Sequence, residues 1–145
     1  MKIIFVCTGN TCRSPMAEVM AEAVLKGKDI DVQSRGIYAE EGMPASENSV
    51  LAVRHYGLTL ENHSSRQLGL EDIMSADLIL TMTDSHKKML EKVCRKDRLF
   101  TLKEYVGKED GDIADPFGGS LDDYLECAEE IAECINLLAE KIRSN

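Results

Sequence analysis

Residues 2–7, KIIFVC, form an apolar run that leads directly into the turn-forming segment TGNTCRSP. A run of this length without polar alternation is typical of a strand buried on both faces, as in a parallel sheet. Ser14 and Pro15 favour the start of a helix, with Ser14 as the N-cap and Pro15 as the first helical residue. The sequence therefore predicts a buried strand, a tight turn and a helix in immediate succession.

The rest of the chain continues this alternation of strand and helix patterns. Further strands are expected at 30–34, 78–81 and 99–102, helices at 46–56, 70–74, 85–94 and from Ser120 onward, and a polar loop at 107–119. Such alternation predicts an α/β fold of three layers, a four-stranded parallel sheet with helices on both faces, in a single domain of residues 1–145. Ligands of such sheets bind at the carboxyl ends of the strands, which places the candidate site at the turn after the first strand.

This turn has the composition of an anion site. A turn containing Gly9 exposes several backbone N–H groups, and the positive end of the following helix dipole points to the same place. Arg13 can bind two oxygens of a tetrahedral anion with its guanidinium fork. The same field favours the thiolate form of Cys7, which would be a nucleophile for a bound phosphoryl group. Ser14 is placed to donate a hydrogen bond to the sulfur, and Asn10 to brace the loop.

The spacing of Cys7 and Arg13 is weak evidence by itself, because about 0.2 chance matches to C-x5-R are expected at this composition. Most of the evidence for an anion site is the position of this motif, directly after a buried strand and before the start of a helix. The alternative is that Cys7 is a small core residue and Arg13 a surface residue. A general acid for the leaving group is expected at Asp115, which Pro116 holds in extended geometry; the alternative there is an ordinary Asp-Pro turn.

Two segments together resemble the low-molecular-weight protein tyrosine phosphatases: Cys7–Pro15, CTGNTCRSP, and Asp115–Phe117, DPF. The resemblance extends over essentially the whole chain. It implies Cys7 as the nucleophile, Arg13 as the phosphate clamp and Asp115 as the general acid, with a reversible Cys7–Cys12 disulfide under oxidation. The residues expected to contact or shape the bound substrate are Thr8, Gly9, Asn10, Thr11, Cys12, Ser14 and Phe117.

Two positions resemble the bacterial protein-arginine phosphatase branch of this family. Thr11 stands where tyrosine-specific members usually carry a bulky aliphatic residue, and Gly118 where they often carry a second tyrosine. The resemblance implies that Thr11 shapes the pocket for phosphoarginine and that Asp115 also recognises the guanidinium group. Phe117 offers a flat face for guanidinium stacking. The alternative is that Thr11 is a tolerated variant in a phosphotyrosine-specific phosphatase.

Charge and cysteine spacing restrict the partners and the compartment. The net charge of −9 argues against nucleic-acid binding. The five cysteines are irregularly spaced without a CxxC pair, and the first apolar run is too short for a signal peptide or a membrane span, so we expect a cytoplasmic protein with reduced thiols. We expect phosphorylated proteins as substrates, a monomer, and no cofactor, metal or membrane partner. His63 is a candidate loop brace, His55 and His86 are expected at the surface, and Cys127 and Cys134 are expected to pack in the last helix.

Two other functions remain as alternatives. Arsenate reductases on this scaffold carry a further mid-chain cysteine pair, whereas only Cys94 lies in that region here. A non-hydrolytic phosphocarrier would need the cysteine alone, without Arg13 or Asp115.

Overall fold

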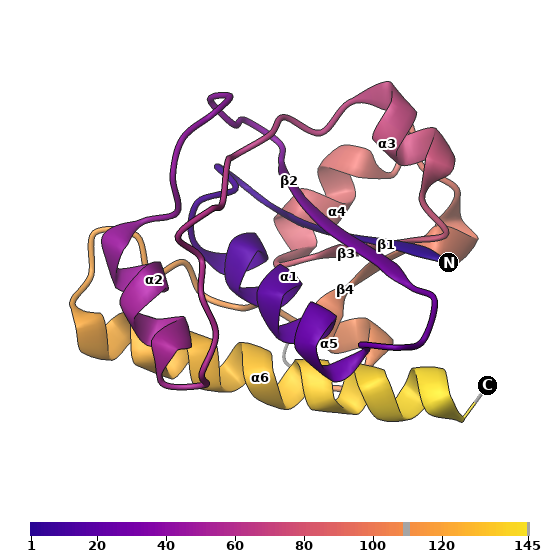
Figure 1. The fold of residues 1–145 in the computed structure, drawn as a ribbon. Coiled ribbons are helices and arrows are strands. Elements are labelled where there is room, and N and C mark those ends of the chain that lie inside the picture. The colour runs from indigo at the N-terminus through magenta and orange to yellow at the C-terminus, as the bar shows by residue number, and fades with distance from the viewer. Residues whose placement is uncertain (109–110, 145) are drawn as a thin grey trace.

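The computed structural model describes residues 1–108 and 111–144, in which strands and helices alternate along the chain (Figure 1). The strands are β1 (Lys2–Cys7), β2 (Asp31–Gly36), β3 (Leu78–Thr81) and β4 (Leu99–Thr101). The helices are α1 (Arg13–Val24), α2 (Glu47–Arg54), α3 (Leu70–Ser75), α4 (Asp84–Leu90), α5 (Leu102–Tyr105) and α6 (Leu121–Arg143), with a short 3-10 helix at Lys96–Arg98.

The four strands form one parallel sheet in the order β2-β1-β3-β4. Cys7, the last residue of β1, pairs with Gly36, the last residue of β2. On the other side of β1, Val6 pairs with Thr81, and Thr81 pairs in turn with Thr101 at the end of β4. The carboxyl ends of all four strands therefore lie along one edge, and the predicted four-stranded parallel sheet is confirmed.

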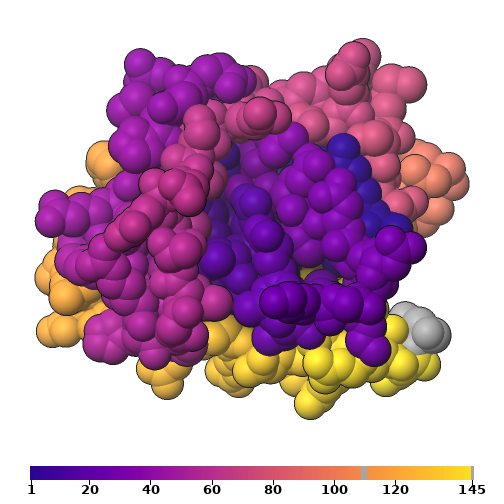
Figure 2. Space-filling view, viewed as in Figure 1, coloured from indigo at the N-terminus to yellow at the C-terminus, as the bar shows by residue number. Residues whose placement is uncertain are grey.

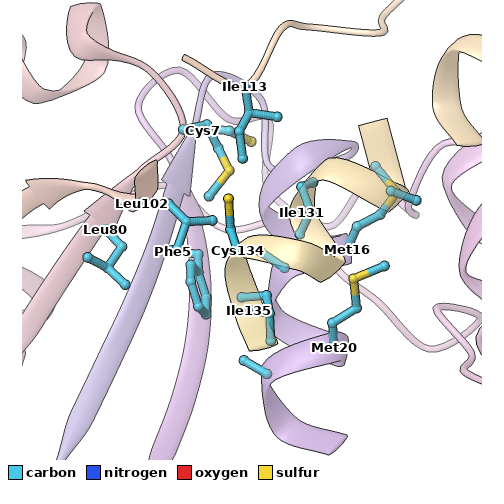
Figure 3. Packing of buried hydrophobic residues seen from close by; sticks show 14 of the residues in the cluster. Phe5, Cys7, Met16, Met20, Leu80, Leu102, Ile113, Ile131, Cys134 and Ile135 are labelled. Carbon is cyan, nitrogen blue, oxygen red and sulfur yellow. The ribbon is translucent and has the colours of Figure 1, made fainter. Parts of the chain in front are cut away.

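Alternate residues of β1 enter two different cores, which is why the whole run is apolar. Phe5 and Cys7 belong to the larger core, which side chains from α1, α2 and α6 complete. Figure 3 shows part of that core, with Cys134 of α6 near Phe5 and with Cys7 at the end of the strand. Ile4 and Val6 point to the opposite face and pack in a smaller core with Leu90 of α4. Helices thus cover both faces of the sheet, giving the three predicted layers.

The longest helix, α6, begins as the sequence predicts. Ser120 is its N-cap, and the Ser120 hydroxyl accepts a hydrogen bond from the backbone N–H of Asp123, whose carboxylate accepts from the backbone N–H of Ser120. This reciprocal pair satisfies two N–H groups that a helix start would leave without a partner. The helix lies against α1 and α2 (Figure 1), and its buried side chains belong to the larger core.

The predicted start of the first helix is wrong. The helix begins at Arg13 with Cys12 as its N-cap and no side-chain cap, so Ser14 is the second helical residue. The Ser14 hydroxyl is instead within 2.9 Å of Cys7 Sγ and accepts a hydrogen bond from Asn10 Nδ2 at 2.9 Å. Local sequence rules assign Ser14 to helix capping, but its hydroxyl instead makes contacts within the loop, with Cys7 and Asn10.

Other boundaries differ more modestly. The strand expected to reach Leu102 ends at Thr101, where a missed capping box of Thr101 and Glu104 starts α5. The helix expected at 85–94 is shorter, Asp84–Leu90, and that expected at 46–56 is Glu47–Arg54, with Ser46 as N-cap and a left-handed Gly57 in the following turn. The second strand lies at 31–36 in place of 30–34. Residues 109–110 of the expected 107–119 loop lie outside the described residues.

Residues 58–69 form most of the link between α2 and α3, and part of this segment runs beside the end of β2. Figure 2 shows this segment as a magenta ridge next to the indigo atoms. The backbone N–H of Gly36 donates to the carbonyl of Arg66, and Gly36 and Gln67 form an isolated parallel bridge, so the segment extends the sheet edge beyond β2. Among the described residues, no helix is long and apolar enough to cross a membrane.

Candidate active site

The loop between β1 and α1 brings a thiol and a guanidinium group together at the carboxyl edge of the sheet. Cys7 is 2% exposed and Arg13 is 4% exposed, so both side chains are surrounded by other protein atoms and have little contact with solvent. Arg13 Nη1 donates to the carbonyl of Ile113 at 2.9 Å, and Arg13 Nη2 lies 3.5 Å from Asp115 Oδ2. These contacts join the N-terminal loop to the segment before α6. Local sequence rules do not predict contacts between residues so far apart along the chain.

Asn10 occupies the centre of the loop and is fully buried. Its backbone has a left-handed φ of 59°, which asparagine tolerates better than most residues. The side-chain Nδ2 donates to Ser14 Oγ and to Ser34 Oγ, both at 2.9 Å, and Oδ1 accepts from the backbone N–H of Arg66 at 2.9 Å. The predicted bracing geometry is thus present, and it extends to two other segments of the chain.

His63 reinforces the same turn. Its Nε2 lies 2.7 Å from the carbonyl oxygen of Asn10, so the ring nitrogen donates. Burial lowers the pKa of His63, while the hydrogen bond to Asn10 works in the opposite direction. The contact agrees with the loop-bracing position expected for this histidine.

A pocket of about 240 Å³ opens above the loop. The residues that line it are Cys7, Thr8, Gly9, Thr11, Cys12, Arg13, Asp115 and Phe117. The structure therefore brings together eight of the ten sequence-predicted site residues around one pocket. The other two, Asn10 and Ser14, are fully buried and do not line it. Asp115 is half exposed at the rim, and Phe117, at 78% exposed, presents its ring to solvent.

A larger hollow of about 480 Å³ lies between residues 114–119, the loop that carries Asp115, and α6. It shares Asp115 and Phe117 with the smaller pocket, but its other charged lining residues are Asp123, Glu126 and Glu130. A surface with this concentration of carboxylates repels an anion, whereas the smaller pocket has Arg13 and the loop N–H groups. The smaller pocket is the one that can hold a phosphoryl group over the Cys7 sulfur.

The prediction that His86 lies at the surface is wrong. His86 is 7% exposed, and its Nε2 lies 2.8 Å from the hydroxyl of Thr8 in the loop. Burial lowers the pKa of His86 to about 4, helped by the positive charge of Arg13 and opposed by Asp112 and Asp115. The one available signal is positional, since His86 follows β3, whose carboxyl end lies beside that of β1.

Tyr124 of α6 is a second residue that local sequence patterns do not place beside the loop. Its hydroxyl lies 3.5 Å from Cys12 Sγ, and Cys12 Sγ lies 3.5 Å from Ser46 Oγ. Burial and the contact with Cys12 raise the pKa of Tyr124 to about 12, so the phenol stays protonated. The hydroxyl groups of Tyr124 and Ser46 thus both lie next to the Cys12 sulfur.

The remaining cysteines have packing environments. Cys127 and Cys134 are buried in α6, as expected, and burial raises the pKa of the Cys127 thiol to about 12. All five cysteines are free thiols in the structure. No cluster of three or more potential metal-ligating side chains occurs in residues 1–108 and 111–144.

Comparison with known proteins identifies the family. The family described as low molecular weight phosphotyrosine protein phosphatase matches residues 2–145. The chain belongs to this family. It is therefore a cysteine-dependent protein phosphatase, as the two segments at 7–15 and 115–117 predict.

Named relatives of this phosphatase fall into two groups. The protein-arginine-phosphatase of Bacillus subtilis (strain 168) is 42% identical over all of this chain and 99% of its own length. The low molecular weight protein-tyrosine-phosphatase PtpB of Staphylococcus haemolyticus is 44% identical, again over all of this chain and 99% of its own. A solved YwlE arginine phosphatase from Geobacillus stearothermophilus has a TM-score of 0.91 and 41% identity, covering 99% of this chain and 93% of that chain.

Proposed function

We propose that this phosphatase hydrolyses phosphoarginine on proteins, with Cys7 as the nucleophile, Arg13 as the phosphate clamp and Asp115 as the general acid. The observation that carries the proposal is the single small pocket that these three residues line together. Arg13 is buried and anchored to the carbonyl of Ile113, so its guanidinium is already oriented before a ligand arrives.

The reaction proceeds in two displacements. The Cys7 thiolate attacks phosphorus, a P–S bond forms as the P–N bond breaks, and Asp115 protonates the departing guanidine nitrogen. Arg13 and the loop N–H groups stabilise the charge on the phosphoryl oxygens. Water then attacks the phosphocysteine while Asp115 accepts its proton, and Ser14, 2.9 Å from the sulfur, stabilises the leaving thiolate. One relative, a YwlE arginine phosphatase mutant, carries a phosphorylated active site serine, which supports a covalent intermediate.

The preference for phosphoarginine rests on the pocket, because relatives of both activities match the whole chain at similar identity. Thr11 lines the pocket, where its β-branched side chain reshapes the wall and adds a hydroxyl that can fix a neighbouring group or a water. Asp115 is half exposed at the rim, where its carboxylate can pair with a cationic guanidinium leaving group. The exposed ring of Phe117 can stack on the same planar group.

Phosphotyrosine hydrolysis is the second candidate, favoured by the PtpB relatives. We also propose that residues 1–145 act as one catalytic domain and that the protein is a cytoplasmic monomer. Its expected substrates are phosphorylated proteins, and the charge of −9 supports the absence of a nucleic-acid partner.

The deciding experiment compares phosphate release from a phosphoarginine peptide and from a matched phosphotyrosine peptide. We expect faster release from phosphoarginine, loss of both activities in Cys7→Ser, and a shift toward phosphotyrosine in Thr11→Ile, with Thr11→Ser as the matched control. A preference for phosphotyrosine in the unmodified protein would overturn the arginine assignment and leave the thiolate mechanism. Release that does not depend on Cys7 would overturn the mechanism as well.

A further inference from the structure

His86 makes a buried contact with the phosphate-binding loop from outside it. It lies on α4, which follows β3, and β3 pairs with β1. Its side chain is 93% buried, with Nε2 2.8 Å from Thr8 Oγ1. Its other ring nitrogen, Nδ1, is buried without a hydrogen-bond partner among the described residues.

The missing partner at Nδ1 decides how the imidazole is protonated. A buried N–H without an acceptor is rarer in proteins than a buried acceptor without a full set of donors. The neutral ring therefore carries its hydrogen on Nε2, where the Thr8 hydroxyl can accept it. In that arrangement the Thr8 O–H hydrogen is not consumed by His86 and remains available to another acceptor.

The surroundings of His86 keep it neutral at the pH of an ordinary assay. The charged groups that act on it are Arg13 from α1 and Asp112 and Asp115 from the segment before α6. Burial dominates and lowers its pKa to about 4, with the nearby Arg13 acting in the same direction. The Nε2–H donor and the unprotonated Nδ1 thus describe the ring in the working enzyme.

Thr8 is the exposed end of this pair. Its side chain lines the same pocket as Cys7 and Arg13, while its backbone carbonyl is already used by the N–H of Tyr38 at 2.9 Å. A hydroxyl whose oxygen is held from behind by an N–H donor is restricted in rotation. Its hydrogen is then free to bond an acceptor in the pocket that Thr8 lines, and the oxygens of a bound phosphoryl group are such acceptors.

We propose that His86 is a positioning residue that holds the Thr8 hydroxyl as a hydrogen-bond donor to the phosphoryl group bound over Cys7. The hydroxyl adds to the donors of Arg13 and the loop N–H groups. Its hydrogen bond strengthens as negative charge accumulates on the phosphoryl oxygens during transfer. The inference rests on the proposed phosphoryl site and holds for phosphoarginine and phosphotyrosine alike.

A double-mutant cycle tests the coupling of the two side chains. Thr8→Val removes the hydroxyl at constant shape, and His86→Leu removes the imidazole donor. We expect kcat/KM to fall about tenfold in each single variant. The double variant should also fall only about tenfold, because both substitutions remove the same interaction, the hydrogen bond from the positioned Thr8 hydroxyl to the phosphoryl group. Independent effects, with a fall of about a hundredfold in the double variant, would overturn the proposal.

Conservative replacements separate positioning from packing. His86→Gln places an amide N–H near the position of Nε2 and is expected to recover kcat/KM to within about threefold of the unmodified protein. His86→Asn is shorter, does not reach Thr8, and is expected to resemble His86→Leu. Equal activities of the Gln and Asn variants would contradict the role of the Nε2–H group. The exposed His55→Leu serves as the matched control, with unchanged kcat/KM.

A binding measurement keeps the inference separate from the proposed function. The affinity of each variant for inorganic phosphate, measured by calorimetry, is expected to show the same non-additivity. If no Cys7-dependent hydrolysis is found, the proposed function fails while the phosphate cycle still tests the His86–Thr8 pair. Unchanged phosphate affinity in Thr8→Val, together with unchanged kcat/KM, would overturn the inference itself.

Discussion

Replacement of Asn10 by alanine is expected to destabilise the protein strongly, although the residue is a single polar side chain in a loop. Asn10 is fully buried, and its amide makes three hydrogen bonds, to Ser14, Ser34 and the backbone of Arg66. Its backbone is left-handed, with φ of 59°. Asn10→Ala therefore removes the side chain that joins three segments and leaves a residue that disfavours this conformation.

The two contributions can be estimated separately. Three buried hydrogen bonds at about 1 kcal/mol each give about 3 kcal/mol. An alanine in the left-handed region adds about 1 kcal/mol, for a total of about 4 kcal/mol. At about 3 °C per kcal/mol for a chain of this size, the melting temperature should fall by about 12 °C. Asn10→Gly loses the same hydrogen bonds but tolerates the backbone, so it should be about 1 kcal/mol more stable than Asn10→Ala.

Urea unfolding followed by circular dichroism gives both free energies of unfolding, and thermal melts give the temperatures. A loss below about 1 kcal/mol in Asn10→Ala would refute the assigned hydrogen-bond network, given the magnitude of each bond. A glycine variant less stable than the alanine variant would refute the backbone contribution. Both variants should also show reduced kcat, since Ser14, whose hydroxyl lies at the Cys7 sulfur, loses its hydrogen bond from Asn10.

Three further changes test other parts of the site. In Ser14→Ala, Cys7 loses the hydroxyl at 2.9 Å, so hydrolysis of the phosphocysteine should slow about tenfold and a burst of leaving-group release should appear in rapid-quench kinetics. Gly36→Ala places a Cβ 2.7 Å from the carbonyl oxygen of Thr8, so the loop must shift; kcat/KM should fall at least tenfold, and an unchanged value would contradict this close approach. Burial, aided by neighbouring carboxylates, raises the pKa of Glu22 from its ordinary value of 4.5 to about 7, so the folded state binds more protons than the unfolded state between these values and stability falls as pH rises through them. Glu22→Gln should remove this fall, and identical pH dependence of the melting temperature in both proteins would argue against it.

Much of the fold was predictable because its signals are local. The uninterrupted apolar run of β1 reflects burial on both faces, and the Ser120 capping box marks the start of α6. Errors concentrate where one residue has two competing uses. Ser14 follows the rules for an N-cap, yet its hydroxyl lies at the Cys7 sulfur, because the loop offers a buried partner that a solvent-exposed helix end does not. Thr101 was expected inside a strand because its apolar neighbours conceal the capping box that starts α5.

By itself the sequence determined the order of a buried strand, an anion-binding turn and a helix, and hence the residues of the loop that line the pocket. Only the tertiary structure decided which distant groups support that loop: the Ile113 carbonyl on Arg13, His86 on Thr8, and the Tyr124 hydroxyl beside Cys12. These partners lie between 78 and 112 residues apart along the chain. Contacts at such separations leave no periodic trace in the sequence, because they depend on which strand ends and helices the sheet topology brings to one edge.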